Sequence, residues 1–278
     1  MIDSPFSKKD LLLAIFFSLI VIGLIVIGSF FDTRTKIVFC DVGQGDGAYI
    51  RIKNRVDLVI DAGPDNKILN CLGKHMPFYD RKIELAILSH PQKDHYYGFI
   101  EISKRYKIDR FVLSKADSTK QSFIKLKDII KNKKIKVVYV MADNTINIIN
   151  DRIYILWPNH ILNTADDNIN SLVFLFQEDN FKALFTGDAN AYILDILLEE
   201  SKTIISPVNI LKIPHHGSKN SLSEKLFRSA NPRLAVISVG KNNSYGHPTK
   251  EVLNSLKALN IKIMRTDEKG DIVYKLRK

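Results

Sequence analysis

Residues 89–95 read Ser89-His90-Pro91-Gln92-Lys93-Asp94-His95 and follow the apolar run 83–88. A short apolar run bounded by proline is typical of a buried strand. This strand would deliver two imidazoles and one carboxylate into a single turn, and both kinds of group bind first-row metals. A polar loop that happens to contain two histidines explains the stretch equally well. The metal-site prediction therefore depends on ligands from other segments.

The chain has 278 residues, enough for one large domain or two small ones. Its hydrophobic fraction of 45% and charged fraction of 26% are ordinary for a globular protein. The net charge of +11, from 41 Lys+Arg against 30 Asp+Glu, favours polyanionic partners such as nucleic acid, anionic lipid or wall polymer. A lysine-rich surface that only keeps the protein soluble is the alternative, because the lysines are spread along the chain.

The two cysteines do not form a Cys-x-x-Cys pair, which argues against a cysteine-based zinc site. Cys40 lies in an apolar, strand-like run, and Cys71 lies in a predicted helix. A disulfide between them requires a location outside the reducing cytosol. We predict two buried, unpaired thiols.

Residues 11–31 contain no charged side chain and are long enough to cross a bilayer. A cleaved signal peptide is disfavoured because the apolar stretch exceeds the usual length of about 7–15 residues and no small-x-small site follows it. We predict a short tail over residues 1–10, a transmembrane signal anchor over 11–31 and one domain over 35–278. The flanking charges weakly favour a cytoplasmic N-terminus. The expected location is a single-pass cell-membrane protein with an extracytoplasmic domain.

From Thr35 onward, short apolar runs alternate with helical patterns, which indicates one α/β domain. Strands are expected at 36–40, 48–53, 57–60, 83–88, 111–113, 136–140, 153–156, 171–177, 181–185, 208–213 and 272–276. Helices are expected at 66–74, 120–131 and 189–200. Residues 159–170 form the longest expected loop.

Histidines and carboxylates gather where these strands end. Five of the seven histidines lie there, and so do three aspartates: His90, His95, His215, His216, His247, Asp61, Asp94 and Asp188. In layered α/β folds the strand ends meet at one edge, where sites form. Histidines scattered through a core would not show this bias. A metal site becomes the leading interpretation.

The order of these motifs resembles the metallo-β-lactamase fold superfamily and, within it, the hydrolase domain of ComEC-type competence proteins. The resemblance extends from Lys36 to the C-terminus. It is carried by residues 41–46, 170–173, 184–188, 211–218, 245–248 and 265–267. It implies a four-layer αββα sandwich that holds metal between its sheets at one edge.

The resemblance also implies a ligand set. One metal site would consist of Asp94, His95, Asp188 and His216, and Asp188 would bridge to a second site that includes His90. Asp61 would orient a ligand histidine, although an aspartate that caps a turn is the alternative. Gln92 stands where the superfamily commonly has histidine or aspartate, so the second metal is expected to bind weakly. We expect one or two divalent ions per chain, Zn or Mn.

The ligand set predicts a metal-dependent hydrolase, and the resemblance to ComEC-type proteins together with the net charge implies a phosphodiesterase or nuclease in DNA uptake. Asp94 and His247 are the catalytic candidates; His247 would act as a general acid or hold phosphate, unless it only caps a helix. His215, Ser218 and Lys241 are the candidate substrate contacts. ComEC-type proteins carry a multi-span channel, so a separate channel partner is expected. A hydrolase of wall-polymer phosphodiesters or small esters, a single-metal or inactive enzyme, and a non-catalytic DNA-binding subunit remain alternatives.

Overall fold

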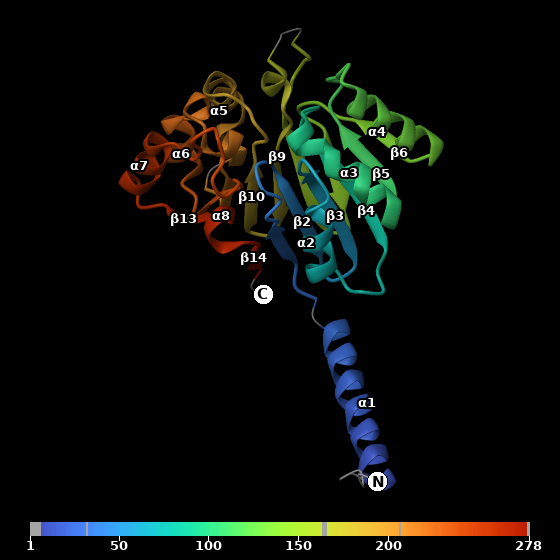
Figure 1. The fold of residues 1–278 in the computed structure, drawn as a ribbon. Coiled ribbons are helices and arrows are strands. Elements are labelled where there is room, and N and C mark those ends of the chain that lie inside the picture. The colour runs from blue at the N-terminus through green and yellow to red at the C-terminus, as the bar shows by residue number, and fades with distance from the viewer. Residues whose placement is uncertain (1–6, 32, 163–165, 206, 277–278) are drawn as a thin grey trace.

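The computed structural model describes residues 7–31, 33–162, 166–205 and 207–276. Most of the predicted tail, together with residues 163–165 of the predicted loop and the last two residues, lies outside the described part. Within the described residues, the strands form two sheets of seven strands each. The two sheets lie face to face, and helices cover their outer surfaces (Figure 1).

The first sheet has the order β14-β1-β2-β3-β4-β5-β6. Its strands β1 to β3 are antiparallel neighbours, whereas β3 to β6 are parallel. The C-terminal strand β14 pairs antiparallel with β1 and so joins the two ends of the domain. The bounds are β1 (Lys36–Phe39), β2 (Gly47–Ile52), β3 (Val56–Ala62), β4 (Lys82–Leu88), β5 (Lys107–Leu113), β6 (Lys136–Tyr139) and β14 (Ile272–Lys275).

The second sheet has the order β13-β12-β11-β10-β9-β8-β7. Strands β10 to β13 are parallel, and β7 to β10 form an antiparallel meander. The bounds are β7 (Thr145–Ile148), β8 (Asp151–Trp157), β9 (Val173–Glu178), β10 (Phe181–Phe185), β11 (Ile210–Lys212), β12 (Leu234–Ile237) and β13 (Lys262–Arg265).

Three apolar layers hold the sandwich together. Between the sheets, Phe39 stacks on Phe185 and Phe185 stacks on Phe174, with ring centroids 5.8 and 5.1 Å apart. Helices α2 (Ile68–His75), α3 (Lys93–Arg105) and α4 (Gln121–Asn132) pack on the first sheet. Helices α5 (Ala191–Ile205), α6 (Glu224–Ala230) and α7 (Lys250–Ala258) pack on the second, and the short α8 (Thr266–Lys269) precedes β14. The predicted αββα sandwich is confirmed.

The N-terminal helix α1 (Lys8–Phe31) projects away from the sandwich (Figure 1). Its described apolar side chains are exposed, among them Leu12, Phe16 and Leu24. Among the residues that the structure describes, no helix meets the length and apolarity needed to cross a membrane. The transmembrane anchor stays a prediction.

The interpretation of residues 89–95 as a single turn is wrong for residues 93–95. Lys93 begins α3, so Asp94 and His95 lie in the first turn of a helix, while Gln92 is the residue before it. The helical period is carried by Tyr96, Phe99 and other side chains further along, which are buried against the first sheet.

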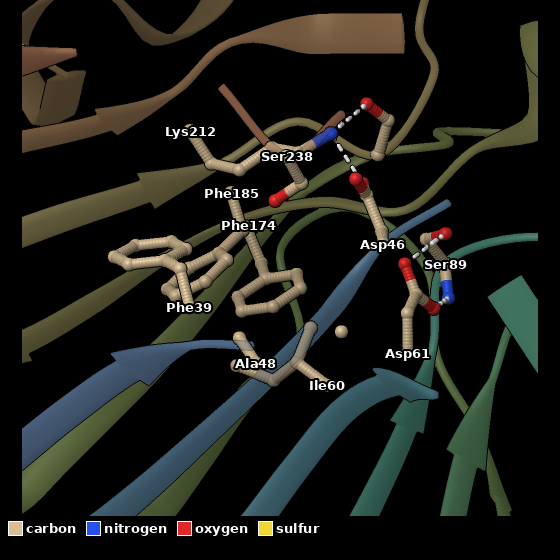
Figure 2. A pocket seen from close by; sticks show the side chains of 12 residues that line it. Phe39, Asp46, Ala48, Ile60, Asp61, Ser89, Phe174, Phe185, Lys212 and Ser238 are labelled. Carbon is tan, nitrogen blue, oxygen red and sulfur yellow. Dashed lines mark hydrogen bonds and ion pairs between the residues drawn. The ribbon is translucent and has the colours of Figure 1, made fainter. Parts of the chain in front are cut away.

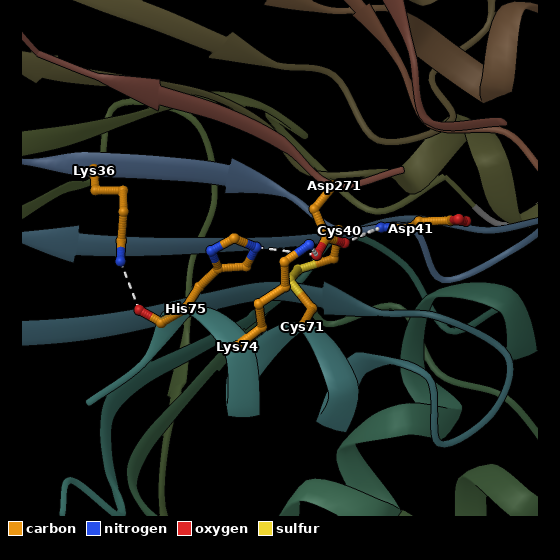
Figure 3. The surroundings of a disulfide bond; sticks show 7 residues. All are labelled: Lys36, Cys40, Asp41, Cys71, Lys74, His75 and Asp271. Carbon is orange, nitrogen blue, oxygen red and sulfur yellow. Dashed lines mark hydrogen bonds and ion pairs between the residues drawn. A yellow bond between two sulfur atoms is a disulfide. The ribbon is translucent and has the colours of Figure 1, made fainter. Parts of the chain in front are cut away.

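The prediction of unpaired thiols is also wrong, because Cys40 and Cys71 form a disulfide (Figure 3). Cys40 follows β1 and Cys71 lies in α2, with their Cα atoms 5.7 Å apart. Beside them, the Asp271 carboxylate accepts a hydrogen bond from the Asp41 amide at 2.9 Å and lies 3.0 Å from His75 Nε2. Disulfide and carboxylate together fasten α2 to β1 and to the turn before β14.

Candidate metal centre

Four donor side chains meet where strands of both sheets end. Asp94 and His95 come from the first turn of α3, directly after β4. Asp188 follows β10, and His216 follows β11. Their ligand atoms all lie within 4.8 Å of one another. The structure thus brings together two donors from each half of the chain.

The spacing of these donors suits a tetrahedral cation. His95 Nε2 lies 3.3 Å from Asp188 Oδ2, and His216 Nε2 lies 3.4 Å from Asp94 Oδ2. The distance from His216 Nε2 to Asp188 Oδ2 is 3.6 Å, and that from His95 Nε2 to Asp94 Oδ2 is 3.9 Å. Bonds of about 2.1 Å in a tetrahedron separate ligands by roughly 3.4 Å.

The donor atoms also lack other partners. His95 Nε2, His216 Nε2 and both carboxylate oxygens of Asp188 are buried and make no hydrogen bond. Buried polar atoms are nearly always satisfied, so unsatisfied atoms on three of the four clustered donors are typical of a cation site. Since two imidazoles and two carboxylates suit a divalent transition metal, the residues present fit the cofactor that the sequence predicts.

The pKa shifts of these side chains also indicate a cation site. Burial opposes protonation of His216, but the charges of Asp188 and Asp46 raise its pKa to about 9. His95 is likewise buried, and Asp188 and Asp61 raise its pKa well above the usual value. In the opposite sense, both imidazoles hold the pKa of the buried Asp188 carboxyl well below its usual value. Protons on the histidines therefore balance charge that a cation would otherwise balance.

Asp61 and Ser89 hold His95 from behind. His95 Nδ1 lies 2.9 Å from Asp61 Oδ2, and the Ser89 amide and hydroxyl both donate to the Asp61 carboxylate, at 2.8 and 2.7 Å. A proton on Nδ1 that is shared with Asp61 leaves the Nε2 lone pair of His95 free to bind a metal.

His216 has a comparable support that the sequence analysis missed. Its Nδ1 lies 2.9 Å from the Ser238 carbonyl oxygen and 3.2 Å from Asp46 Oδ1. Asp46 in turn forms an ion pair with Lys212, and both side chains are buried. Burial opposes ionisation of Asp46, but Lys212 and then His216 bring its pKa below the usual value. The signals in the sequence were a carboxylate within a glycine-rich turn and a lysine within an apolar strand.

Two glycines allow α3 to sit close to the first sheet. A Cβ on Gly45 would lie 2.4 Å from the carbonyl oxygen of Asp94, and Gly45 has a φ of 150°. A Cβ on Gly98 would lie 1.9 Å from the carbonyl oxygen of Ala62. Larger residues at either position would push the first turn of α3, with its two donors, away from the other two.

A cavity of about 10 Å³ lies behind the centre, between the sheets. Figure 2 shows rings of Phe39, Phe174 and Phe185 on one side of it and the polar groups of Asp46 and Lys212 on the other. That volume is close to the minimum for one water molecule. A narrow polar layer, which contains Asp46 and Lys212, thus separates the candidate metal donors from the apolar core between the sheets.

The second site predicted around His90 is incomplete. His90 is buried, and its Nε2 atom has no hydrogen-bond partner. The ring centroids of His90 and His95 are 4.2 Å apart. Burial and the charge of His95 lower the pKa of His90 to about 3, so it is neutral. Gln92, however, donates from Nε2 to Asn168 Oδ1 at 2.9 Å and is held by the 3₁₀ turn Asp167–Asn170. The amide is therefore engaged with protein rather than presented as a ligand.

A cleft of about 450 Å³ opens at the centre, and two of the four donors, Asp94 and His216, line it. Its lining contains Lys67, Lys93, Gln92, His215, Tyr245 and His247, beside Asp94 and His216. Two of the predicted substrate contacts do not line it in the described part of the chain. Ser218 is buried and accepts a hydrogen bond from the Asn220 amide, and Lys241 is exposed outside the cleft.

His247 also lines the cleft. Its ring centroid is 5.8 Å from that of His215, and its buried Nδ1 atom has no hydrogen-bond partner. Burial, and then the charges of His215 and His216, lower its pKa. At neutral pH His247 is therefore an uncharged imidazole that can donate or accept one hydrogen bond.

Known proteins share this architecture. The structure matches YhfI from Bacillus subtilis, described as a metallo-β-lactamase fold protein, with a TM-score of 0.59 and 10% identity over 86% of this chain and 99% of that one. The chain has the metallo-β-lactamase fold. A second metallo-β-lactamase-type match is Igni18, described as a metallo hydrolase, from Ignicoccus hospitalis, with a TM-score of 0.56 and 11% identity over 87% of this chain and 100% of that one.

Sequence comparison adds a more specific similarity. This chain is 26% identical over 264 residues to ComE operon protein 3 of Bacillus subtilis, a ComEC-type competence protein, and the match covers 88% of this chain. The match covers only 33% of that relative, so the chain spans about a third of its length. No protein-family model matches the chain.

Proposed function

We propose that this chain is a metal-dependent phosphodiesterase that cleaves nucleic acid, and that it works in DNA uptake. The observation that carries the proposal is the set of unpartnered donor atoms of His95, Asp188 and His216 beneath a cleft with cationic walls. The similarity to ComEC-type proteins supports the context of DNA uptake. The net charge of +11 suits a polyanionic substrate better than a neutral one.

The residues of the chain have separate tasks in this proposal. Asp94, His95, Asp188 and His216 would hold one divalent cation, Zn or Mn, and Asp61 and Asp46 fix the two imidazoles. When bound, the cation supplies a Lewis acid that stabilises negative charge on a phosphoryl oxygen. Lys67 and Lys93 balance charge on the phosphates, and His247 donates a hydrogen bond to the leaving oxygen.

The first test measures metal content and hydrolysis together. The full chain, purified in detergent and loaded with Zn²⁺ or Mn²⁺, should bind one ion tightly and cleave oligonucleotides and methyl p-nitrophenyl phosphate. Asp188→Asn should lose the ion and lower the rate by about three orders of magnitude, since it removes a ligand and its charge. His90→Ala should still bind one ion.

The control is Asp179→Asn, which changes an exposed aspartate in the turn between β9 and β10 and should match the parent protein. A parent protein that binds less than one ion per chain and cleaves neither substrate contradicts the proposal and favours a non-catalytic DNA-binding subunit. Faster cleavage of phosphocholine esters than of oligonucleotides would instead favour wall-polymer phosphodiesters as substrates.

We also propose that the domain lies outside the cytoplasm and that residues 11–31 attach it to the membrane. Two observations support this location. The disulfide between Cys40 and Cys71 is stable in oxidising compartments, and the described apolar side chains of α1 have no protein to pack against. A separate channel protein would be the partner that moves DNA.

The location is tested in intact cells. A protease added from outside should remove the domain and leave only a short protected fragment, and the cysteines should resist alkylation until a reductant is added. A domain that survives protease until the cells are lysed would contradict the proposed topology.

A further inference from the structure

Tyr245 is a large aromatic side chain that the proposed hydrolysis does not use. It lies in the loop between β12 and α7, on the wall of the cleft, and its side chain is 69% exposed. Its ring stacks on that of His247, with centroids 5.8 Å apart and planes 26° apart. One face of Tyr245 therefore has a partner, and the ring stands beside the residue that we place at the leaving oxygen.

The loop that carries Tyr245 is held in shape by one side chain. The Asn243 amide donates to the carbonyl oxygens of Gly240 and His247, at 3.0 and 2.7 Å, and its oxygen accepts from the His247 amide at 3.1 Å. These three bonds close the loop on both sides of residue 245. The exposed ring is thus presented in a fixed position, so little conformational entropy is lost when it binds a ligand.

The same cleft is also lined by two cationic side chains. Lys67 precedes α2 and Lys93 begins α3, and both line the cleft together with the metal donor Asp94. A cleft lined by cations, an exposed aromatic ring and candidate metal donors matches the parts of a nucleotide. The phosphate would lie at the donors and the lysines, and the base would lie on the ring.

We propose that Tyr245 is a stacking platform for one unpaired nucleobase next to the phosphate that is cleaved. This inference rests on the proposed function and names its substrate: single-stranded nucleic acid or a frayed end. A base inside a duplex already has both faces stacked, so it must first be unstacked before it can lie on Tyr245. Stacking on an aromatic side chain accepts any base, so the platform would show little sequence preference.

The test compares two esters that share a leaving group. Thymidine 5′-(p-nitrophenyl phosphate) carries a base, and methyl p-nitrophenyl phosphate does not. In the parent protein, kcat/KM should favour the thymidine ester. Tyr245→Ala should reduce this ratio about 5- to 150-fold, which is the range for losing one stacked base. Tyr245→Phe should keep the ratio, because stacking does not require the hydroxyl.

The matched control is Tyr192→Ala. Tyr192 lies in α5 and is also 69% exposed, but it is not part of the cleft lining. It should keep the parent ratio, and the parent and Tyr192→Ala should both cleave single-stranded oligonucleotides faster than the matching duplex. Tyr245→Ala should lose most of that preference.

Two outcomes would overturn the inference. One is an equal loss on both esters in Tyr245→Ala, which would mean that Tyr245 only positions His247. The other is no loss on either ester. If the parent cleaves neither ester, the proposed function fails. Stacking is then decided by equilibrium binding, in which Tyr245→Ala must weaken binding of oligo(dT) but not of an abasic strand of the same length, or the inference fails too.

Discussion

Lys212 and Asp46 form an ion pair behind the candidate metal ligand His216, at a depth where lysine and aspartate are rarely found. Asp46 also contacts His216, so the pair fixes one imidazole of the site while Lys212 balances the carboxylate. A buried pair of this kind contributes little net stability, because desolvation offsets the attraction. Its contribution is the orientation of His216.

The pair therefore predicts strong coupling between two mutations. Asp46→Asn or Lys212→Met alone should each destabilise the protein by about 3–5 kcal/mol, because a buried charge loses its main counter-charge. The loss of stability in the double variant should be clearly smaller than the sum of the two single losses. Urea unfolding of the metal-free proteins measures this, and metal titration should show that Asp46→Asn also weakens metal binding by about 10- to 100-fold.

The exposed pair Lys127–Asp117 is the control for this cycle. Exposed ion pairs couple by about 1 kcal/mol or less, so the same cycle there should be nearly additive. Additive costs at Asp46 and Lys212 would show that the two side chains act independently.

Protons and metal should compete at His216. In the metal-free protein its pKa is about 9, so at neutral pH it carries a proton that must leave before Nε2 can bind a cation. Metal affinity should rise as the pH rises towards 9 and level off above it, by up to about tenfold per pH unit for each proton released. Calorimetric titrations in buffers of different ionisation enthalpy would count the protons. Affinity that does not change between pH 6.5 and 8.5 would contradict this account.

At the scale of elements, the disulfide joins the end of β1 to α2 across 31 residues of sequence. A loop of this size predicts a stabilisation of about 3–4 kcal/mol through the unfolded chain. The Cys40→Ala/Cys71→Ala variant should lose that amount in urea unfolding. A reductant should bring the parent to the same stability and leave the variant unchanged. A parent protein that is insensitive to reductant would show that the bond contributes nothing.

Elements with a local signal in the sequence were predicted well. The hairpin of β9 and β10 was found because apolar runs flank the polar turn at Asp179, and both strand bounds lie within two residues of those predicted. Helix α3 (Lys93–Arg105) is absent from the predicted helices, and Pro91 with the polar residues after it hides its first turn. The contacts of Lys212 with Asp46 and of Cys40 with Cys71 join distant segments, so only the folded chain places them together.

The candidate site also divides into residues that the sequence indicates and features that only the folded chain creates. Strand ends indicated eight histidines and aspartates, and the resemblance to the metallo-β-lactamase superfamily selected the four donors among them. Ser218 and Lys241, predicted as substrate contacts, lie outside the cleft lining. Tyr245 was quoted only as part of a motif. Exposure and the stacking on His247 are properties of the folded loop.

At the scale of the whole molecule, the net charge of +11 should affect long substrates more than short ones. Binding of a nucleic acid releases condensed counterions, so its affinity falls steeply with salt. Between 50 and 200 mM NaCl, kcat/KM on a 20-nucleotide strand should fall at least about tenfold. The rate on methyl p-nitrophenyl phosphate should change little, since it carries a single charge. Equal salt dependence of the two substrates would argue against a polyanion as the substrate.

The division of the four donors between the sheets has a consequence for biosynthesis. Asp94 and His95 belong to the half of the chain that is made first, whereas Asp188 and His216 belong to the half that is made later, and β1 must wait for residues 272–275 before it can pair with β14. A chain that ends before Asp188 would hold only two of the four candidate donors and is expected to lack the proposed activity. The proposed activity is therefore expected only after both halves have been made. A chain divided near residue 160 should yield two inactive fragments, and their reassembly could be followed by the return of hydrolysis.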